Sequence, residues 1–403
     1  MSNIVIIGAG HAGSRTAEHL IKLGCMDKIY IFGEEKYYPY ERPPLSKGFL
    51  LGEKKIIDFT LFSKNFFDSN NISLSLNNKI NKIDISNKQV IDANNKKLNF
   101  DKLIFANGSS PKKINFKNIE GIYYLRNIKD SITIKKNIID KNHIVILGGG
   151  FIGLEIASII KKKYNKKKIT IIEASPNILS RNSNEYIRKI LYNLHIENKI
   201  DINLNTQIKD IIGENHINKI VFTNGKELKT DMLIVGIGVY PNTDILENQP
   251  IDLLNGIKVN EYCETNIKDI YAVGDVACYK SIFLDKHIRE ESWNNAEKQA
   301  QIVAANITGQ KRIYNEIPWF WTDQYENNFQ IIGQIDNFDK VLVRTYDQQK
   351  LIYFFLKNDK IKGAFAINNG RDIRITKKII EKNDKKNFEE VQDLNYNLKN
   401  LIK

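Results

Sequence analysis

Two glycine-rich segments have the residue types and spacing that bind the phosphates of a dinucleotide. Gly8-Ala9-Gly10-His11-Ala12-Gly13 and Gly148-Gly149-Gly150-Phe151-Ile152-Gly153 both match Gly-x-Gly-x-x-Gly. The first glycine of this pattern permits a tight turn, the second lets a pyrophosphate approach the backbone, and the third allows a helix to pack closely on a strand. The amino-terminal end of the following helix attracts the phosphate charges. One match alone carries little weight, but two in suitable surroundings predict two dinucleotide sites.

An acidic residue follows each glycine segment at a distance that suits the hydroxyl pair of an adenosine ribose. Glu34 lies 26 residues after Gly8, and Glu173 lies 25 residues after Gly148. Two dinucleotides on one chain favour a flavin paired with a nicotinamide nucleotide. Because an acid repels a 2′-phosphate, Glu173 favours NADH over NADPH.

The residues around each glycine segment predict a strand, a helix and a second strand. In the first copy these elements are expected at 3–7, 11–23 and 28–32. In the second copy, about 140 residues later, they are expected at 143–147, 151–163 and 168–172. This recurrence predicts an internal duplication of one βαβ unit and therefore an α/β fold.

The remaining apolar runs predict further strands and a change of architecture near residue 323. Short buried strands are expected at 103–106, 232–235 and 270–273. Beyond 323, strands followed by a helix indicate a small α+β domain, with elements at 329–332, 341–346, 351–356, 361–367 and 372–381. The lysine-rich tail from Asn383 is expected to be partly ordered at best.

Length and composition exclude several classes of protein. A chain of 403 residues exceeds what one core usually organises, so two or three domains are expected. With 42% hydrophobic and 27% charged residues, the chain is neither disordered nor collagen-like. No apolar run approaches the ~20 residues of a membrane span, and no charged leader precedes the first strand. The three cysteines form no CxxC pair, which excludes a disulfide framework and favours the cytoplasm.

Positive charge is concentrated in the middle of the chain. The formal net charge is +13, and residues 111–242 hold +10 of it, including six lysines between 161 and 168. Such a field could steer an acidic partner. Alternatively, it reflects a lysine- and asparagine-rich composition on a solvated surface. No nucleic-acid-binding motif accompanies the charge, so nucleic acid is not an expected partner.

Seven stretches, one of which overlaps the second glycine segment, resemble one family along nearly the whole chain. They lie at 40–47 (YERPPLSK), 105–108 (FANG), 149–155 (GGFIGLE), 236–242 (GIGVYPN), 271–275 (YAVGD), 291–296 (ESWNNA) and 319–325 (WFWTDQY). The chain is similar to the FAD-dependent, NADH-linked ferredoxin or rubredoxin reductases of oxygenase systems. Apoptosis-inducing factor and monodehydroascorbate reductase are wider relatives. Two departures are Asn107, where the family usually has threonine, and the segment 368–371.

The resemblance implies a glutathione-reductase-like architecture with two Rossmann-type dinucleotide-binding domains and a C-terminal α+β domain. The FAD-binding domain would comprise residues 1–110 and 243–322. The NAD-binding domain would comprise 111–242, inserted between those two segments. The C-terminal domain would comprise 323–403.

The resemblance also assigns roles to individual residues. Lys47 and Glu155 would be the catalytic pair, with the lysine balancing charge on the reduced flavin and the glutamate holding the lysine. FAD would be contacted by Gly8, Gly10, Ala12, Gly13, Glu34, Arg42, Lys47, Ile80, Arg126, Asp275 and Trp293. The remaining cofactor-binding positions would be Ala106, Gly148, Gly150, Phe151, Ile152, Gly153, Glu155, Glu173 and Gly238.

The chemistry that the chain lacks narrows the choice of electron acceptor. Disulfide reductases pass electrons through a thiol beside the flavin, but the matching segment here, residues 42–47, contains no cysteine. Electrons would then leave the flavin directly, which favours a protein carrier. The six histidines show no metal-ligand spacing, so no metal site is expected.

Three functions fit this pattern. The leading interpretation is an NADH:ferredoxin or NADH:rubredoxin oxidoreductase, whose partner is a small acidic iron–sulfur protein. The first alternative is a small-molecule reductase or oxidase of the monodehydroascorbate reductase type. The second is an NADH-binding interaction protein of the apoptosis-inducing-factor type.

Overall fold

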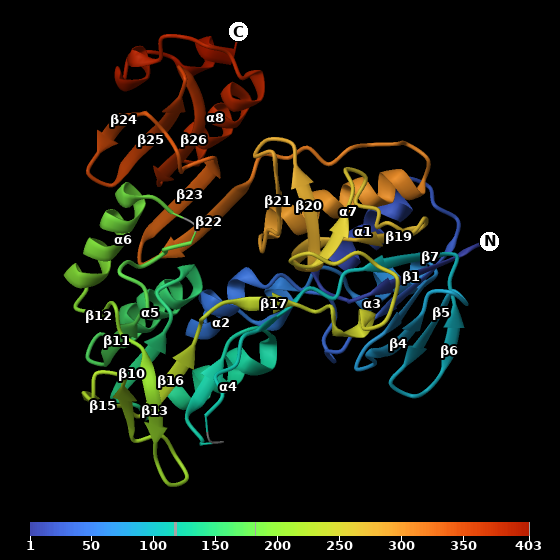
Figure 1. Cartoon of the computed structure of the whole chain (residues 1–403), viewed down its shortest axis with the longest axis horizontal. Coiled ribbons are helices and arrows are strands. Elements are labelled where there is room, and N and C mark those ends of the chain that lie inside the picture. Colours follow the sequence, from blue (N-terminus) through green and yellow to red (C-terminus); the bar gives the residue numbers. More distant parts are fainter. Residues whose placement is uncertain (117–118, 182, 403) are drawn as a thin grey trace. The chain divides into compact units, whose positions relative to one another are not determined.

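The computed structural model describes residues 1–116, 119–181 and 183–402, and the chain divides into two compact units (Figure 1). Unit 1 comprises Met1–Arg42, Lys55–Ser110 and Tyr240–Pro318. Unit 2 comprises Pro43–Lys54, Pro111–Val239 and Trp319–Lys403. Each unit therefore joins segments that are distant in the sequence.

Unit 1 is built on a five-stranded parallel sheet. Its central strand, β1, consists of β-branched residues after Asn3 and is buried on both faces, as is typical of parallel sheets. In order across the sheet, the strands are β19 (Ile270–Ala272), β7 (Lys102–Phe105), β1 (Asn3–Ile7), β2 (Lys28–Phe32) and β3 (Ile72–Ser75).

Helices and two small sheets complete unit 1. Helix α1 (His11–Lys22) packs against α7 (Trp293–Ile307). The small sheets are β4 (Ile80–Asp84), β5 (Gln89–Asp92) and β6 (Lys97–Asn99), and β18 (Ile257–Val259), β20 (Ala277–Ser281) and β21 (Lys286–Ile288). The short helices are α3 (Lys64–Ser69), η2 (Ile56–Phe59), η3 (Asp244–Leu246) and η4 (Gly274–Val276).

Unit 2 repeats the parallel-sheet arrangement. In order, the strands are β12 (Asp201–Asn203), β11 (Lys168–Ile172), β10 (His143–Leu147), β16 (Met232–Val235) and β9 (Ile122–Tyr124). Here β10 and α5 take the positions that β1 and α1 take in unit 1, which confirms the predicted duplication. The helices are η1 (Pro43–Ser46), α2 (Gly48–Leu51), α4 (Ile128–Ile138), α5 (Phe151–Lys163) and α6 (Glu185–Glu197), and the small antiparallel sheet is β13 (Ile208–Ile212), β14 (Lys219–Phe222) and β15 (Glu227–Lys229).

The carboxyl-terminal part of unit 2 is a five-stranded antiparallel sheet with a helix against it. In order, the strands are β22 (Trp319–Gln324), β23 (Asn327–Gly333), β26 (Lys360–Ile367), β25 (Lys350–Lys357) and β24 (Lys340–Asp347), and helix α8 (Gly370–Lys382) follows. Four strands and the helix match the prediction. The sequence reading missed β22, which pairs with β23 and begins four residues before the predicted boundary at 323.

A further two-stranded sheet consists of β8 (Ser109–Pro111) and β17 (Val239–Pro241).

The lysine-rich tail is more ordered than its composition indicated. It forms η5 (Glu389–Gln392) and η6 (Leu398–Ile402), and Val391, Leu398 and Leu401 are buried. The buried guanidinium of Arg344 explains this order, because its terminal nitrogens donate to four backbone carbonyls of the tail, those of Val391, Asp393, Leu394 and Tyr396. Its Nε donates to Tyr346, so all its nitrogens have acceptors.

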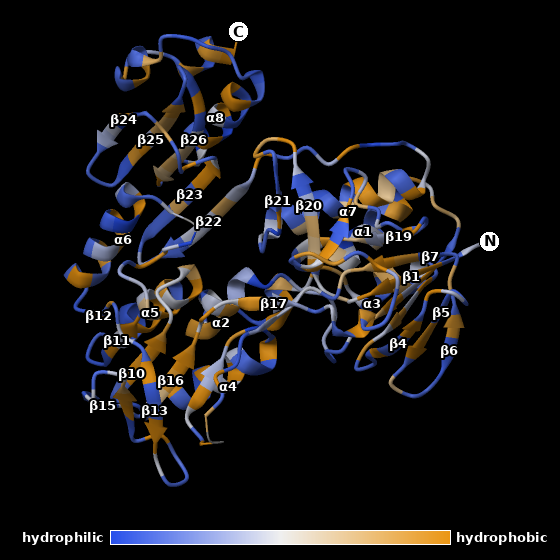
Figure 2. Ribbon diagram, viewed as in Figure 1, coloured by the Kyte–Doolittle hydropathy of each residue, from blue (hydrophilic) through white to orange (hydrophobic). Residues whose placement is uncertain are grey.

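Hydrophobic residues line the central strands of both parallel sheets (Figure 2), as the apolar runs predicted. The observed strands and helices of the duplicated units begin and end within one or two residues of the predicted ones. Within the described ranges, no helix has the length and apolar character needed to cross a membrane.

Candidate functional site

The glycines of the first segment have separate steric roles. Gly8 has φ +115°, and a Cβ built on it would lie 2.2 Å from the carbonyl oxygen of Ala106. A Cβ on Gly13 would lie 2.0 Å from the carbonyl oxygen of Gly8. Neither position can accept a side chain. Gly10 differs, because its Cβ would meet no atom within 4 Å, so this glycine borders open space.

The second segment repeats this pattern. Gly148 has φ +110°, and its Cβ would lie 2.4 Å from the carbonyl oxygen of Gly236. A Cβ on Gly153 would lie 2.1 Å from the carbonyl oxygen of Gly148, whereas a Cβ on Gly150 would meet nothing within 4 Å. In both copies the second glycine therefore leaves a space where a phosphate could approach the backbone.

The two helices that follow these glycines lack the usual side-chain caps. Among the described helices longer than ten residues, α4, α6, α7 and α8 are capped by the side chains of Asn127, Asn184, Ser292 and Asn369. Helices α1 and α5 begin at a glycine with no side-chain cap, and neither has an acid in its first turn. Their first-turn N–H groups and positive dipole ends fit an anionic pyrophosphate.

The two acids predicted for ribose binding follow equivalent strands, but only the carboxylate of Glu173 is held by backbone hydrogen bonds in the described structure. At the end of β11, Glu173 accepts the Gly149 N–H on Oε2 at 2.7 Å and the Ser175 N–H on Oε1 at 2.8 Å. These bonds fix the carboxylate and leave further lone pairs for a diol. Glu34, after β2, is 74% exposed and lies 4.0 Å from Lys79.

Arg42 lies in unit 1 and is held by a neighbouring acid. Its Nη2 pairs with Glu35 Oε1 at 3.0 Å, and the Tyr40 hydroxyl donates to Glu35 Oε2 at 2.6 Å. Sequence reasoning named Arg42 but missed Glu35, which stands beside the predicted Glu34. The spacing of Tyr40 and Arg42, which places both side chains on one side of an extended segment, is a sequence signal that could have indicated a shared partner.

Other predicted positions of unit 1 are distributed as follows. Ala106 follows β7 and supplies the carbonyl that faces Gly8, while buried Ile80 begins β4. Asp275 lies in η4 and accepts the Ser109 hydroxyl at 2.8 Å. Ala12 lies in the first turn of α1.

Trp293 begins α7 and contacts α1. Its Nε1 donates to Glu41 at 3.2 Å, and its ring lies 4.9 Å from the ring of His11. The Nε2 of His11 in turn lies 3.2 Å from Glu297. Although burial opposes it, the pKa of Glu297 is held well below its usual value by hydrogen bonds to His11 and His19 and by the charge of Arg15.

Within unit 2, the predicted catalytic pair is in contact. The Nζ of Lys47, at the start of α2, lies 3.3 Å from Glu155 Oε1 and 3.0 Å from Asp323. The carboxyl group of Glu155 also accepts the Ser46 hydroxyl on Oε2 at 2.8 Å and the Thr322 hydroxyl on Oε1 at 2.7 Å. Burial raises the pKa of Glu155, while Lys47 and the two hydroxyls oppose that rise.

Four more predicted positions, Phe151, Ile152, Gly238 and Arg126, belong to unit 2. Phe151 begins α5 and its ring lies 4.6 Å from that of Phe320. Ile152, the second residue of α5, is 46% exposed. Gly238 has φ +102° and precedes β17, while Arg126 lies before α4 and its backbone N–H donates to Asp130.

Comparison with known proteins supplies the family. A family model described as pyridine nucleotide-disulphide oxidoreductase matches residues 2–300, and one described as reductase C-terminal matches residues 319–402. The chain belongs to the pyridine nucleotide-disulphide oxidoreductase family. Membership confirms the predicted family resemblance and makes the protein an oxidoreductase that uses a flavin and a nicotinamide nucleotide.

Individual members of this oxidoreductase family are similar over nearly the whole chain. The rubredoxin-NAD(+) reductase of Pseudomonas putida is 34% identical over 372 residues, which is 91% of this chain and 95% of that one. A putidaredoxin reductase, solved in covalent complex with putidaredoxin, has a TM-score of 0.94 at 29% identity, covering 100% of this chain and 98% of that one. A ferredoxin reductase from Rhodopseudomonas palustris has a TM-score of 0.95 at 28% identity and covers 100% of both chains. The glutathione-reductase-like fold class is therefore confirmed.

The cysteines of this oxidoreductase form no disulfide. Cys263 and Cys278 are buried, Cys25 is partly buried, and all three thiols are free. Burial raises the pKa of each thiol, which opposes formation of a reactive thiolate. In the described part of the chain, no cluster of three or more histidine, cysteine or acidic residues is placed to hold a metal.

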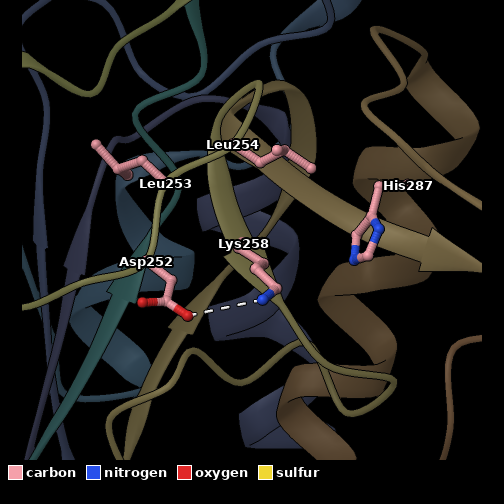
Figure 3. Close-up of a pocket in the computed structure, with 5 residues that line it drawn as sticks. All are labelled: Asp252, Leu253, Leu254, Lys258 and His287. Atoms are coloured by element: carbon pink, nitrogen blue, oxygen red, sulfur yellow. Dashed lines mark ion pairs between the residues drawn. The ribbon is translucent and has the colours of Figure 1, made fainter.

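A surface pocket of about 300 Å³ lies in unit 1. It is lined by Asp252, Leu253, Leu254, Lys258 and His287 (Figure 3). Two of these residues, Asp252 and Lys258, form an ion pair at 3.7 Å. None of the predicted site residues lines this pocket.

Proposed function

We propose that this protein passes electrons from NADH through FAD to a ferredoxin or rubredoxin. The observation that carries the proposal is the similarity, over more than 90% of the chain, to reductases named for these small redox proteins. The two glycine segments with uncapped helices support a chain that holds two dinucleotides at once.

We assign FAD to the first glycine segment, Gly8–Gly13, in unit 1. Gly8, Gly10 and Gly13 would admit its pyrophosphate to the start of α1, and Glu34 would bind its adenosine ribose. The other proposed flavin contacts remain Ala12, Arg42, Lys47, Ile80, Arg126, Asp275 and Trp293, and Ala106 remains a proposed cofactor-binding position. The predicted division into an FAD-binding domain, an NAD-binding domain and a C-terminal domain is retained as part of this proposal.

We assign NADH to the second glycine segment, Gly148–Gly153, in unit 2. Gly148, Gly150 and Gly153 would admit its pyrophosphate to the start of α5, and the fixed carboxylate of Glu173 would accept the ribose hydroxyls. The fixed negative charge supports NADH rather than NADPH, because a 2′-phosphate would face it. Phe151, Ile152 and Gly238 remain proposed cofactor contacts.

Lys47 and Glu155 would assist electron entry. A bound flavin supplies an acceptor for the hydride of NADH. Lys47 would provide a fixed positive charge against the negative charge that reduction creates, and Glu155 would hold the Lys47 ammonium in one orientation. Ser46 and Thr322 satisfy the oxygens of Glu155, so a buried carboxylate can persist there.

The free cysteines support the choice of acceptor and of compartment. With no thiol relay in the described chain, electrons would leave the reduced flavin directly for an iron–sulfur carrier. Free thiols also accord with a reducing compartment, and we propose that the protein acts in the cytoplasm.

The test is reconstitution of the electron-transfer sequence. Purified protein should bind one FAD per chain, be reduced anaerobically by NADH, and then reduce an acidic [2Fe–2S] ferredoxin or a rubredoxin faster than it reduces a neutral quinone. Substitution Lys47→Met should slow flavin reduction at saturating NADH by at least ~10-fold while leaving NADH affinity nearly unchanged. A chain that binds no flavin, or that reduces quinone faster than every iron–sulfur carrier, would refute the proposal.

A further inference from the structure

A chain of polar side chains runs through the interior of unit 2 from Tyr325 to Glu155. The Tyr325 hydroxyl lies 3.2 Å from His195 Nδ1, and His195 Nε2 lies 2.9 Å from Gln324 Oε1. Gln324 Nε2 lies 3.2 Å from Thr322 Oγ1, which lies 2.7 Å from Glu155 Oε1. Thr322, Gln324 and His195 are each at most 1% exposed, so water does not compete for these bonds.

Three elements bring these residues together. In β22, alternate residues point to the same face of the sheet, so Thr322 and Gln324 are adjacent along one face. His195 comes from the last turn of α6, and Glu155 comes from the buried face of α5. The chain thus links two helices of the nucleotide-binding fold through a strand of the antiparallel sheet.

When Glu155 is ionised, hydrogen counting fixes the direction of each bond from Thr322 to His195. The Thr322 hydroxyl has one hydrogen, which it donates to the carboxylate. Its oxygen must therefore accept the hydrogen from the Gln324 amide nitrogen. This orientation turns the amide oxygen of Gln324 toward His195.

The same counting fixes the state of His195. Because its Nε2 faces an amide oxygen, Nε2 carries the hydrogen, and the free lone pair of Nδ1 accepts from the Tyr325 hydroxyl. Burial lowers the pKa of His195 to about 4, so the ring is neutral near pH 7 and holds this single tautomer. With the other tautomer, two acceptors would face each other at Gln324.

We propose that His195 is a positioning residue for the carboxylate of Glu155. Its Nε2–H holds the amide of Gln324, the amide holds the oxygen of Thr322, and the Thr322 hydrogen is thereby committed to Glu155. Every donor in the chain points toward the carboxylate and favours its ionised form beside Lys47. This inference rests on the proposed function, in which Glu155 holds Lys47 in place.

The charged surroundings of Glu155 define what the chain adds. The Nζ of Lys47 lies 3.3 Å from Glu155 and 3.0 Å from Asp323 of β22. Ser46 of η1 contributes a second neutral donor. Burial raises the pKa of Glu155. Hydrogen-bond donors that stabilise the carboxylate reduce this rise.

The experiment measures the ionisation of Glu155 directly in the holoenzyme. Protein labelled with 13C at the glutamate carboxyl carbon is titrated by NMR with FAD bound, and the Glu155 signal is identified by its loss in Glu155→Gln. The midpoint of this titration does not require turnover. The pH profile of flavin reduction by NADH is recorded on the same variants as a second readout.

Paired substitutions separate hydrogen bonding from packing. His195→Leu fills a similar space without a donor, and we expect it to raise the Glu155 midpoint by about one pH unit. His195→Gln restores an N–H near the position of Nε2, and should return the midpoint to within ~0.3 of the parent value. His143→Leu is the matched control, because His143 bonds to Thr170 in the same unit and lies outside the chain.

Thr322→Val provides the decisive arm and remains informative if His195→Leu folds poorly. Thr322→Val should raise the midpoint by at least as much as His195→Leu. In the Thr322→Val background, His195→Leu should add no further shift, because its effect passes through the lost hydroxyl. Additive shifts, an unchanged midpoint in Thr322→Val, or failure of His195→Gln to restore the midpoint would overturn the proposal.

Failure of the proposed function would give a different result. If Glu155 responds as expected but the rate of flavin reduction does not follow its ionisation, the chain positions Glu155 and the assigned role of the Lys47–Glu155 pair is wrong. If flavin reduction depends on Lys47 but the Glu155 midpoint ignores His195, the function stands and this inference fails.

Discussion

Glu173 is the residue that should decide between the two nicotinamide nucleotides. Its carboxylate is fixed by two backbone N–H groups, so it cannot turn away from a 2′-phosphate without losing both bonds. We expect kcat/KM for NADH to exceed that for NADPH by at least ~10-fold, since a contact of this kind contributes about 1–3 kcal/mol. Steady-state kinetics with both nucleotides measure the ratio.

Two variants test the origin of that preference. Glu173→Gln removes the charge but keeps an acceptor for one backbone N–H, so it should narrow the ratio with a modest loss of NADH affinity. Glu173→Ala should narrow it too, with a larger rise in KM for NADH because Gly149 and Ser175 lose their acceptor. Equal kcat/KM values for both nucleotides in the parent protein would contradict the assignment.

The residues of the candidate site were predictable to unequal degrees. Lys47 and Glu155 were identified through the resemblance, and the structure places them in contact. Ser46, Thr322 and His195 were missed, because their bonds join side chains that lie 109, 167 and 129 positions from their partners. No local pattern of residue types records such a contact. The binding roles of all these residues stay predictions.

Glu290 should make the stability of the protein depend on pH. Burial raises its pKa to about 7 in the folded chain, although the Tyr279 hydroxyl donates to it. A raised carboxyl pKa means that the folded state prefers the protonated form. Stability from this group is therefore fully present below about pH 4.5 and is lost as the pH rises toward 7.

Glu290→Gln should remove this dependence while keeping an acceptor for Tyr279. We expect the difference in unfolding free energy between parent and variant to change by roughly 1 to 3 kcal/mol between pH 4.5 and 7.5. Glu291→Gln is the neighbouring control, since Glu291 is 43% exposed and pairs with Arg289. Denaturation curves at several pH values measure the difference, and parallel curves for parent and Glu290→Gln would contradict the expectation.

At the scale of elements, substitutions at the start of α5 can distinguish an effect on NADH binding from an effect on stability. Gly150 borders open space with φ −78°, so alanine fits the backbone there, but its methyl group would occupy the space proposed for the pyrophosphate. Gly150→Ala should therefore leave the melting temperature nearly unchanged and weaken NADH binding by at least ~10-fold. Titration of NADH binding and thermal melting measure the two effects.

Gly153 is the matched position in the same helix. A Cβ there would lie 2.1 Å from a backbone oxygen, so Gly153→Ala should lower the melting temperature as well as NADH affinity. Equal destabilisation by both substitutions would show that Gly150 has a structural role. Unchanged NADH affinity in Gly150→Ala would contradict the assignment of the pyrophosphate to the start of α5.

The elements themselves were predictable where local sequence dictates them. The strands and helices around both glycine segments were placed within a residue or two, because turn glycines and apolar periodicity are local signals. Strand β22 was missed since its aromatic residues, Trp319 to Trp321, give no clear alternation. The tail was judged poorly ordered from its lysines, and its order depends on one distant guanidinium, that of Arg344.

At the scale of the molecule, charge is divided unequally between the two units. Counted over the full sequence, unit 2 carries a net charge of +14 and unit 1 a net charge of −1. The lysines from 161 to 163 add to this charge but are also held locally. Lys161 donates to the carbonyl of Lys167, Lys162 pairs with Glu326 at 2.8 Å, and Lys163 donates to the carbonyl of Leu51.

This distribution predicts a salt effect that depends on the acceptor. An acidic iron–sulfur carrier should be attracted by the field of unit 2, and that attraction decays with ionic strength because the Debye length is ~10 Å at 0.1 M. We expect the rate of carrier reduction at limiting carrier to fall several-fold between low salt and ~0.5 M. A neutral quinone feels no such field, so NADH-to-quinone turnover should stay nearly flat. Ferricyanide is unsuitable as the control, because its negative charge is steered as well.

The lysine run offers a way to locate the source of the field. Since unit 2 would keep most of its positive charge after Lys161, Lys162 and Lys163 are changed to glutamine, we expect the carrier rate at low salt to fall less than ~2-fold. A larger fall would make the run a docking element rather than part of a solvated surface. If the carrier and quinone rates of the parent protein respond to salt alike, electrostatic steering is excluded. A small-molecule acceptor then becomes the better interpretation.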